Sequence, residues 1–292
     1  MEWPTWLLIP MVYAAWLLAI AGHHALGEFA GTVSLILATC WFTSLQHELI
    51  HGHPSRSAEV NRLMGIAPLA VWYPYELYRK SHLAHHRDEL LTEPGIDPES
   101  NYVDEASWRR MSPLLRPLWI AQRTVLGRVL LGPALVIVPT WLDIVRRPLR
   151  GDHSQTRTWA VHLLLVCAML LLLDRCAGIG PIRYLLTVCY PALGLAMFRS
   201  FYEHRPAAEA SHRVVVNEAA LFWRILYLNN NYHAVHHERP GLPWYRIRGF
   251  YLRHRADVLS RNGGFMIPGY LPLMKRFATT PVDSPIHPAR AD

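Results

Sequence analysis

The sequence has little charge for its length. Of its 292 residues only 17% are charged and 51% are hydrophobic, whereas a soluble domain usually carries about a quarter charged residues. Too few charged side chains are present to cover a water-exposed surface of this size. A disordered protein and a coiled coil are excluded, because both need more charge. The 11 Trp, the 13 Tyr and several long apolar runs instead favour a membrane domain with a polar lobe.

Cysteine and lysine are also scarce. The four cysteines lie in or beside apolar stretches and show no CxxC spacing; they are Cys40, Cys167, Cys176 and Cys189. This pattern excludes a secreted disulfide scaffold and a cysteine-based zinc or iron–sulfur site. Lys80 and Lys275 are the only lysines among 29 basic residues. Such a preference for arginine hints at a GC-rich bacterial genome, so we expect a bacterial protein.

Four apolar runs are long enough to cross a bilayer, which takes about 20 apolar residues per helix. They are Trp6–Ala21, Gly31–Leu45, Trp159–Leu173 and Pro181–Phe198. Short turns join the first to the second and the third to the fourth, so we predict two membrane hairpins. The first run lacks a basic flank and is followed at once by another, which argues against a cleaved signal peptide. Leu118–Trp141 is also long, but Arg123, Arg128 and two prolines interrupt it, and we expect interfacial or re-entrant helices there.

The basic residues predict the orientation. Residues 51–158 contain 14 of the 29 Lys and Arg, and residues 199–292 contain 13. By the positive-inside rule both polar segments lie in the cytoplasm, and we expect a helical cap there beneath a bacterial inner membrane. Lipid headgroups explain the basic balance, so no nucleic acid is expected as a partner. We predict one all-α membrane domain over residues 1–278 and a disordered tail over residues 279–292, where prolines are frequent and apolar residues few.

Histidines occur in three clusters, all in the segments assigned to the cytoplasm. The clusters read HELIH at residues 47–51, HLAHH at 82–86 and HAVHH at 233–237. On a helix, spacings of three and four place side chains on one face. One further histidine follows the fourth apolar run directly. The candidate metal ligands are therefore His47, His51, His82, His85, His86, His204, His233, His236 and His237.

Nine imidazoles in a partly buried place need partners, because burial of an unpaired polar group costs free energy. A metal site satisfies them, and imidazole suits iron, zinc, copper and nickel. One ion takes at most about six ligands, so nine histidines predict two ions. Asn230, Asn231 and Glu48 adjoin the clusters and are candidates for hydrogen bonds to the ligands, although the asparagines could equally cap a helix. An acidic run over residues 88–99 is expected to be a solvated loop, with the alternative that one or two of its carboxylates hold an imidazole of the second cluster.

HELIH, HLAHH and HAVHH resemble the three histidine boxes of the membrane fatty acid desaturase superfamily, which includes acyl desaturases, hydroxylases and carotenoid ketolases. Their order, spacing and placement around the second hairpin are similar over residues 30–245. The resemblance implies four transmembrane helices, a cytoplasmic cap, two non-haem irons, O2 as the oxidant and electrons from outside. It also implies that the eight histidines of the boxes are iron ligands and that His204 is the family's additional ligand.

The function implied is O2-dependent oxidation of an unactivated C–H bond in a lipid-like substrate. Desaturation is favoured on the family analogy, and hydroxylation or ketolation is the alternative. No haem-binding segment and no cysteine cluster is present. The electrons are therefore expected from a ferredoxin or a cytochrome b5-type donor with its reductase, docking on the basic cap.

Two other functions, a zinc metalloprotease and a metal transporter, match the sequence less well. HELIH also matches the HExxH motif of zinc metalloproteases, with Glu48 as the general base. An intramembrane protease needs a distal Asp in an LDG-like segment, whereas Leu142-Asp143-Ile144 lacks the glycine, and the other histidines would have no role. A metal transporter would need ligands near the middle of its spans, where only His162 occurs.

Overall fold

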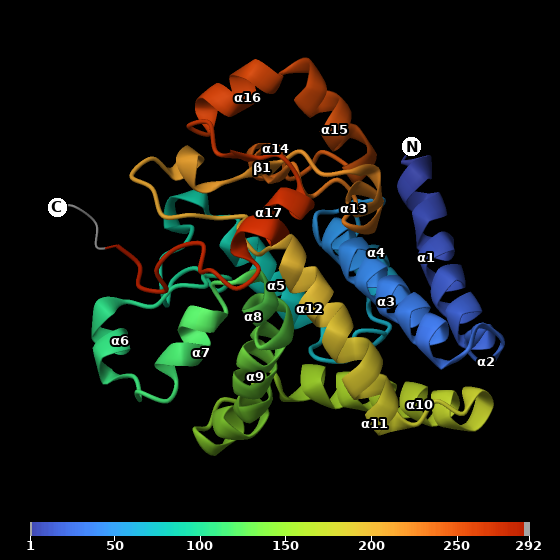
Figure 1. Cartoon of the computed structure of the whole chain (residues 1–292). Helices are drawn as coiled ribbons and strands as arrows, with labels where there is room; N and C mark the ends of the chain where they lie inside the picture. Colours follow the sequence, from blue (N-terminus) through green and yellow to red (C-terminus); the bar gives the residue numbers. More distant parts are fainter. Residues whose placement is uncertain (1, 289–292) are drawn as a thin grey trace. The chain divides into compact units, whose positions relative to one another are not determined.

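The computed structural model describes residues 2–288 and is mostly helical, with one short two-stranded sheet (Figure 1). It consists of two compact units, each assembled from two stretches of the chain. Unit 1 comprises Met1–Arg79 and Gly132–Ala196, and unit 2 comprises Lys80–Leu131 and Met197–Asp292. The domain predicted over residues 1–278 is thus made of two units, and the chain passes from unit 1 to unit 2, back to unit 1 and again to unit 2.

Unit 1 holds the long apolar helices. Its elements are α1 (Trp3–Ala21), α2 (His23–Leu26), α3 (Glu28–Ile50), α4 (Ala58–Gly65), the first part of α5 (Tyr75–His85), α9 (Gly132–Leu149), α10 (Thr156–Ala177), α11 (Pro181–Arg183), a π-helical turn (Tyr184–Cys189) and most of α12 (Tyr190–Arg199). The four predicted apolar runs are confirmed as helices. Gly178, with φ 62°, ends α10 in the left-handed region that favours glycine, and the turn between α10 and α11 follows.

Aromatic and polar contacts join the helices of unit 1. The helices α1 and α3 lie side by side (Figure 1), and the rings of Tyr13 and Phe42 meet edge-on at 5.8 Å. Near the end of α3, Gln46 Nε2 donates to Gly65 O at 2.8 Å, which ties α4 to this helix. Every residue from Leu45 to Ile50 is buried. Through Gln46, the end of α3 that carries His47 is therefore anchored to α4.

Within residues 2–288, five segments are long and apolar enough to cross a membrane. Four correspond to the predicted runs, and the fifth is Val125–Leu149. This fifth segment overlaps the stretch expected to hold interfacial or re-entrant helices, and it is indeed interrupted. The chain forms α8 (Val125–Leu130), breaks at Leu131 and continues as α9, which contains Pro139. Length and hydropathy thus admit five spans where four were predicted, and the difference comes from this one segment.

Unit 2 is built from short elements. They are the end of α5, a 3-10 turn at Asp88–Leu90, α6 (Glu105–Arg110), α7 (Arg116–Ala121), α8, a 3-10 turn at Ala210–Arg213, β1 (Val216–Asn217), α13 (Leu221–Leu226), α14 (His233–Glu238), α15 (Trp244–Arg253), α16 (Arg255–Arg261), β2 (Met266–Ile267) and α17 (Tyr270–Phe277). The strands β1 and β2 pair in parallel. Figure 1 shows α15 and α16 as an arch over α14 and β1.

A small apolar core lies beneath this arch. Its members come from β1, α14, α15, α16 and the loops beside them; they are Leu91, Val214, Val216, Tyr232, Ala234, Val235, Ile247, Tyr251 and Val258. The rings of Tyr232 and Tyr251 lie 4.9 Å apart. Burial of these side chains stabilises the unit through the hydrophobic effect. The short helix α14, which would not form alone in water, is thereby fixed in place.

The described part of the C-terminal segment, which was expected to be disordered, makes hydrogen bonds with distant residues of unit 2. Val103 N donates to Pro285 O, and His287 N donates to Val103 O, at 2.9 Å each. The Asp283 carboxylate accepts from Arg123 Nε at 2.7 Å and from the Tyr102 hydroxyl at 2.6 Å. The buried Arg123 cation needs this carboxylate, a demand that the tail's composition does not reveal. Residues 289–292 of the predicted tail lie outside the described residues.

Candidate metal centre

Three segments of unit 2 bring seven of the nine predicted histidines together. The end of α5 carries three, the loop after α12 carries one, and α14 carries three. Within α5 and α14 the spacings of three and four residues aim the imidazoles to one side of the helix. The seven side chains are buried or half-buried; they are His82, His85, His86, His204, His233, His236 and His237.

The first group in unit 2 consists of four imidazoles whose Nε2 atoms face one another. His204 Nε2 lies 3.0 Å from His85 Nε2 and 3.1 Å from His233 Nε2. His237 Nε2 lies 3.2 Å from His233 Nε2. One nitrogen from each of the four residues can be chosen so that all lie within 4.8 Å of one another. The four side chains therefore surround a space of atomic size.

A second group in unit 2 has the same arrangement. His86 Nε2 lies 3.1 Å from His82 Nε2 and 3.1 Å from His236 Nε2. Because His82, His85 and His86 share the end of α5, and His233, His236 and His237 share α14, each helix contributes to both groups. Two neighbouring clusters of ligand atoms result from one pair of helices.

The first histidine cluster lies in unit 1, at the end of α3. His47 is the last-turn residue of this helix and His51 follows its final residue, and their ring centroids are 4.9 Å apart. His47 is buried and His51 is half-buried. Glu48, between them, is 5% exposed. The HELIH segment therefore presents its two imidazoles together, as its spacing predicts.

Polar side chains hold several imidazoles from behind through Nδ1. His85 Nδ1 donates to Asp97 Oδ1 at 2.8 Å, and His82 Nδ1 donates to Glu99 Oε1 at 3.0 Å. His233 Nδ1 lies 3.1 Å from Asn230 Oδ1. Metal-binding histidines are commonly oriented in this way. A proton held on Nδ1 leaves the Nε2 lone pair of each ring free to bind a metal ion on the opposite side of the ring.

The supporting residues were only partly foreseen. Within the acidic run, Asp97 and Glu99 contact the second cluster, so the alternative interpretation holds for these two. Asn230 orients His233, whereas Asn231 Nδ2 donates to Asn217 O at 2.6 Å and supports the backbone beside β1. Glu203 was not predicted to act here; its Oε2 lies 3.7 Å from His233 Nε2. Its position directly before His204 was the available signal.

Burial strongly affects the protonation state of the imidazoles in unit 2. It lowers the pKa of His82, His204, His233 and His237, and together with the neighbouring imidazoles it lowers the pKa of His86 to about 3. Burial also lowers the pKa of His85, but the carboxylates of Glu99 and Asp97 outweigh it and raise this pKa to about 8. Near neutral pH most of these imidazoles are therefore neutral, as metal ligands must be.

The donor set fits metal ions. Where neither Nε2 atom of a pair carries a proton, nitrogens 3.1–3.2 Å apart, as in His204–His233 and His233–His237, repel each other unless a positive charge lies between them. A metal bound to imidazole at about 2.0–2.1 Å holds two adjacent ligand nitrogens about 3 Å apart when they meet it near a right angle. The Nε2 spacing in both groups of unit 2 agrees with this value. Both groups are compatible with a metal site.

The sequence model of the family described as "Fatty acid desaturase" matches residues 27–268. The match begins at the start of α3 and ends after β2, so it includes all three histidine clusters and His204. Among curated proteins, none matches the chain.

We predict that the carboxylate behind His85 governs metal affinity. Replacement of Asp97 by Ala removes the acceptor of the Nδ1 proton, and loss of such a partner typically weakens metal binding by about 10–100-fold. The measurement is titration of the metal-free protein with Co²⁺ in competition with a chelator. Asp104→Ala, at the exposed start of α6, is the matched control and should bind as the wild type does. Equal affinities for both variants would contradict the role assigned to Asp97.

Proposed function

The chain belongs to the fatty acid desaturase family, and from this premise we propose that it uses O2 to oxidise an unactivated C–H bond of a lipid or lipid-like substrate at two non-haem irons. The observation that carries the proposal is the set of Nε2 atoms that face one another at 3.0–3.2 Å in two groups. Histidine-only sites of this kind suit iron. Within the family's chemistry, we propose desaturation, with hydroxylation or ketolation as the alternative.

All nine predicted histidines are proposed as iron ligands. The geometry of unit 2 supports seven of them. The assignment of His47 and His51 rests on the HELIH sequence, which occupies the place of the family's first box. Glu48 is proposed to support these two rings by hydrogen bonding, since it is buried beside them.

Bound iron supplies the activation of O2, which no side chain can provide alone. The chain's own residues hold and orient the site. Asp97, Glu99 and Asn230 fix the tautomers of three ligands. Glu203, whose pKa burial raises, can hold a proton on its carboxyl group beside His204. These hydrogen bonds hold the rings in a fixed orientation, and the position of the substrate carbon then decides which hydrogen leaves.

The reaction predicts a distinct change in substrate mass. Desaturation removes two hydrogens, whereas hydroxylation adds one oxygen atom. We expect aerobic cells expressing the protein to accumulate a lipid lighter by two hydrogens, detected by mass spectrometry of extracted lipids against cells without it. His236→Ala should abolish the product because it removes a ligand. His24→Ala, an exposed residue of α2, should leave it unchanged.

Two results would contradict this proposal. An oxygenated lipid in place of the lighter one would show hydroxylation or ketolation. Full product formation by His236→Ala would show that the histidine groups are not the reaction site.

We also propose that four helices cross a bacterial inner membrane and that the histidines lie on its cytoplasmic side. Two hairpins return the chain to the side from which it started. The basic residues of segments 51–158 and 199–292 favour the cytoplasm for both. In this arrangement Val125–Leu149 lies at the interface, since the buried Arg128 and the break at Leu131 disfavour a continuous span.

Topology reporters distinguish four spans from five. A fluorescent protein active only in the cytoplasm, fused to the N-terminus or to the C-terminus, should fluoresce in both fusions if four helices cross. An enzyme active only in the periplasm should be silent at both ends. Opposite locations of the two ends would show that an odd number of helices crosses and that Val125–Leu149 is a span.

A further inference from the structure

The outer side of α15 and its surroundings carry arginines that no carboxylate neutralises. Residues 239–261 contain six arginines and one carboxylate, Asp257, and all six arginines are exposed. Arg255 pairs with Glu218 and Arg261 pairs with Glu238. Among the described residues, no ion pair is formed by the other four, which are Arg239, Arg246, Arg248 and Arg253.

Three of these arginines form one surface with an aromatic ring. Arg246, Phe250 and Arg253 follow one another at spacings of four and three, so they share a face of α15. The Arg239 guanidinium lies over the Phe250 ring, 4.6 Å from its centroid. We call Arg239, Arg246, Phe250 and Arg253 the arginine face. Ile247 and Tyr251 form the buried side of α15, whereas Arg246 and Arg253 are exposed.

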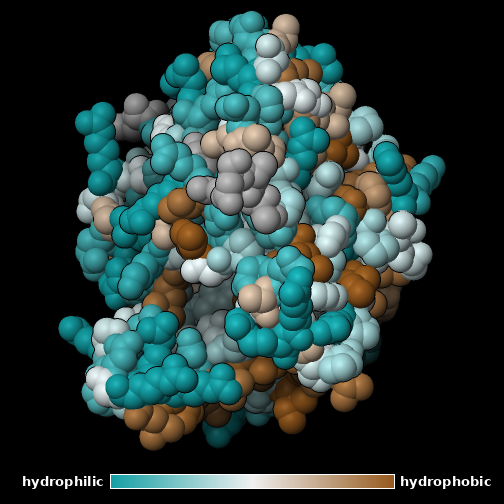
Figure 2. Space-filling model, turned by 90° about the vertical axis from the view of Figure 1, so that its left-hand side faces the viewer, coloured by the Kyte–Doolittle hydropathy of each residue, from teal (hydrophilic) through white to brown (hydrophobic). Residues whose placement is uncertain are grey.

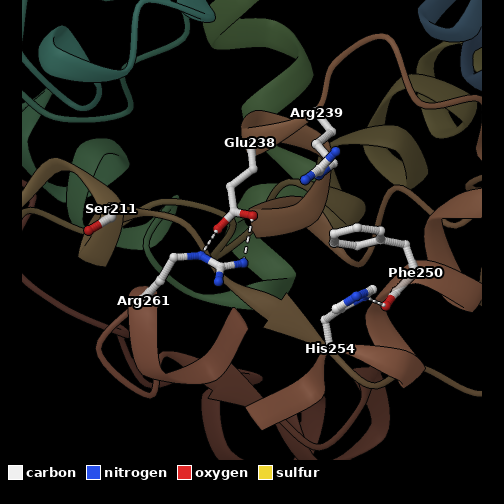
Figure 3. Close-up of a pocket in the computed structure, with 6 residues that line it drawn as sticks. All are labelled: Ser211, Glu238, Arg239, Phe250, His254 and Arg261. Atoms are coloured by element: carbon white, nitrogen blue, oxygen red, sulfur yellow. Dashed lines mark hydrogen bonds and ion pairs between the residues drawn. The ribbon is translucent and has the colours of Figure 1, made fainter. Parts of the chain in front are cut away.

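A hollow of about 820 Å³ adjoins the arginine face. Figure 3 shows Glu238 paired with Arg261 on one side of it and Phe250 with His254 on another, with Arg239 nearby. Hydrophilic residues gather at the top of Figure 2, the end of unit 2 at which α15 and α16 lie. The surface is therefore polar, cationic and uneven, and a protruding acidic side chain could enter it.

The arginine face lies on the reverse side of the third histidine cluster. Glu238, which lines the hollow, follows His237 directly in the chain. Tyr251 follows Phe250 in the chain. The ring of Tyr251 lies 4.9 Å from the ring of Tyr232, and Tyr232 directly precedes His233 in the chain. One layer of packed aromatic residues thus joins the exposed surface to the proposed iron ligands.

The proposed reaction needs electrons from outside. Reduction of O2 to two waters takes four electrons: desaturation supplies two, with two protons, from the substrate, and a donor must supply two more while solvent supplies two protons. No haem-binding segment and no cysteine cluster in the chain can store them. Resting on the proposed function, we propose that the arginine face is the docking surface for an acidic one-electron carrier protein, which is oxidised once for each electron delivered.

The composition of the face favours a protein over a lipid surface. A helix that lies on a membrane exposes a row of large apolar side chains, whereas on α15 only Leu252 is a large exposed apolar residue. Arginine and aromatic residues are enriched at protein interfaces. Unpaired arginines attract an acidic partner from a distance and orient it as it approaches, which suits a carrier that must bind briefly and leave.

The test compares two charge-reversed variants of the full chain. Arg246→Glu with Arg253→Glu alters the arginine face, and Arg109→Glu with Arg110→Glu makes the same change on exposed α6. The probe is a soluble [2Fe–2S] ferredoxin of net negative charge, and its dissociation constant is measured by thermophoresis on detergent-purified protein. We expect the first variant to bind about tenfold more weakly, the control to bind as the wild type, and added salt to weaken wild-type binding.

A second pair of measurements keeps this inference separate from the proposed function. Iron content and product formation driven by dithionite should be unchanged in the arginine variant, because the chemical reductant needs no docking. Their absence in the wild type would refute the proposed function and leave the binding result standing. No ferredoxin binding by the wild type, or equal binding by both variants, would overturn the docking proposal. Loss of binding to phosphatidylglycerol vesicles without loss of ferredoxin binding would also overturn it, by making the face a lipid site.

Discussion

Burial of imidazoles whose lone pairs face one another is the constraint on which the rest of this structure depends. An unprotonated nitrogen that is removed from water needs a partner, and in unit 2 the Nε2 atoms find mainly one another, at 3.0–3.2 Å. A cation bound between them would satisfy these nitrogens together. The polar residues behind the rings and the apolar core beside α14 hold the imidazoles in this position.

Unit 2 contains both the histidine groups and the arginine face, which we proposed as the docking surface for an electron carrier. The same short segment that carries the third histidine cluster packs against α15, whose outer side is cationic. The proposed docking surface and the proposed iron ligands therefore lie on different sides of one small core, with Tyr232 and Tyr251 between them. Unit 1 is of a different character, since its long helices expose many large apolar side chains such as Leu18 and Leu164. Such surfaces suit a lipid environment.

The sequence predicted what depends on local periodicity. The apolar runs became α1, α3, α10 and the segment of α11 and α12, because hydropathy over about 20 residues is a strong local signal. The histidine rows were predictable for the same reason, since spacings of three and four determine which side chains share a helical face. His204 was found by its place after the fourth run. These features need no knowledge of how distant segments meet.

What depends on contacts between distant segments was harder to predict. Asp97 and Glu99 approach the second cluster only because the chain after α5 turns back, and an acidic run in sequence resembles a solvated loop. The order of residues 279–288 depends on a buried arginine some 160 positions earlier in the chain. The break at Leu131 turned one apolar segment into two helices in different units. In each case contacts between distant segments outweighed the preference of the local sequence.

The central claim is that the histidine groups hold two irons, and metal analysis tests it most directly. The detergent-purified protein, expressed with iron supplementation, is assayed by plasma mass spectrometry for iron and zinc per chain. The account predicts about two irons per chain, falling sharply in His86→Ala, whose ring belongs to the second group. One zinc with little iron, retained under iron supplementation, would contradict it and would instead favour the zinc hydrolase that HELIH also permits.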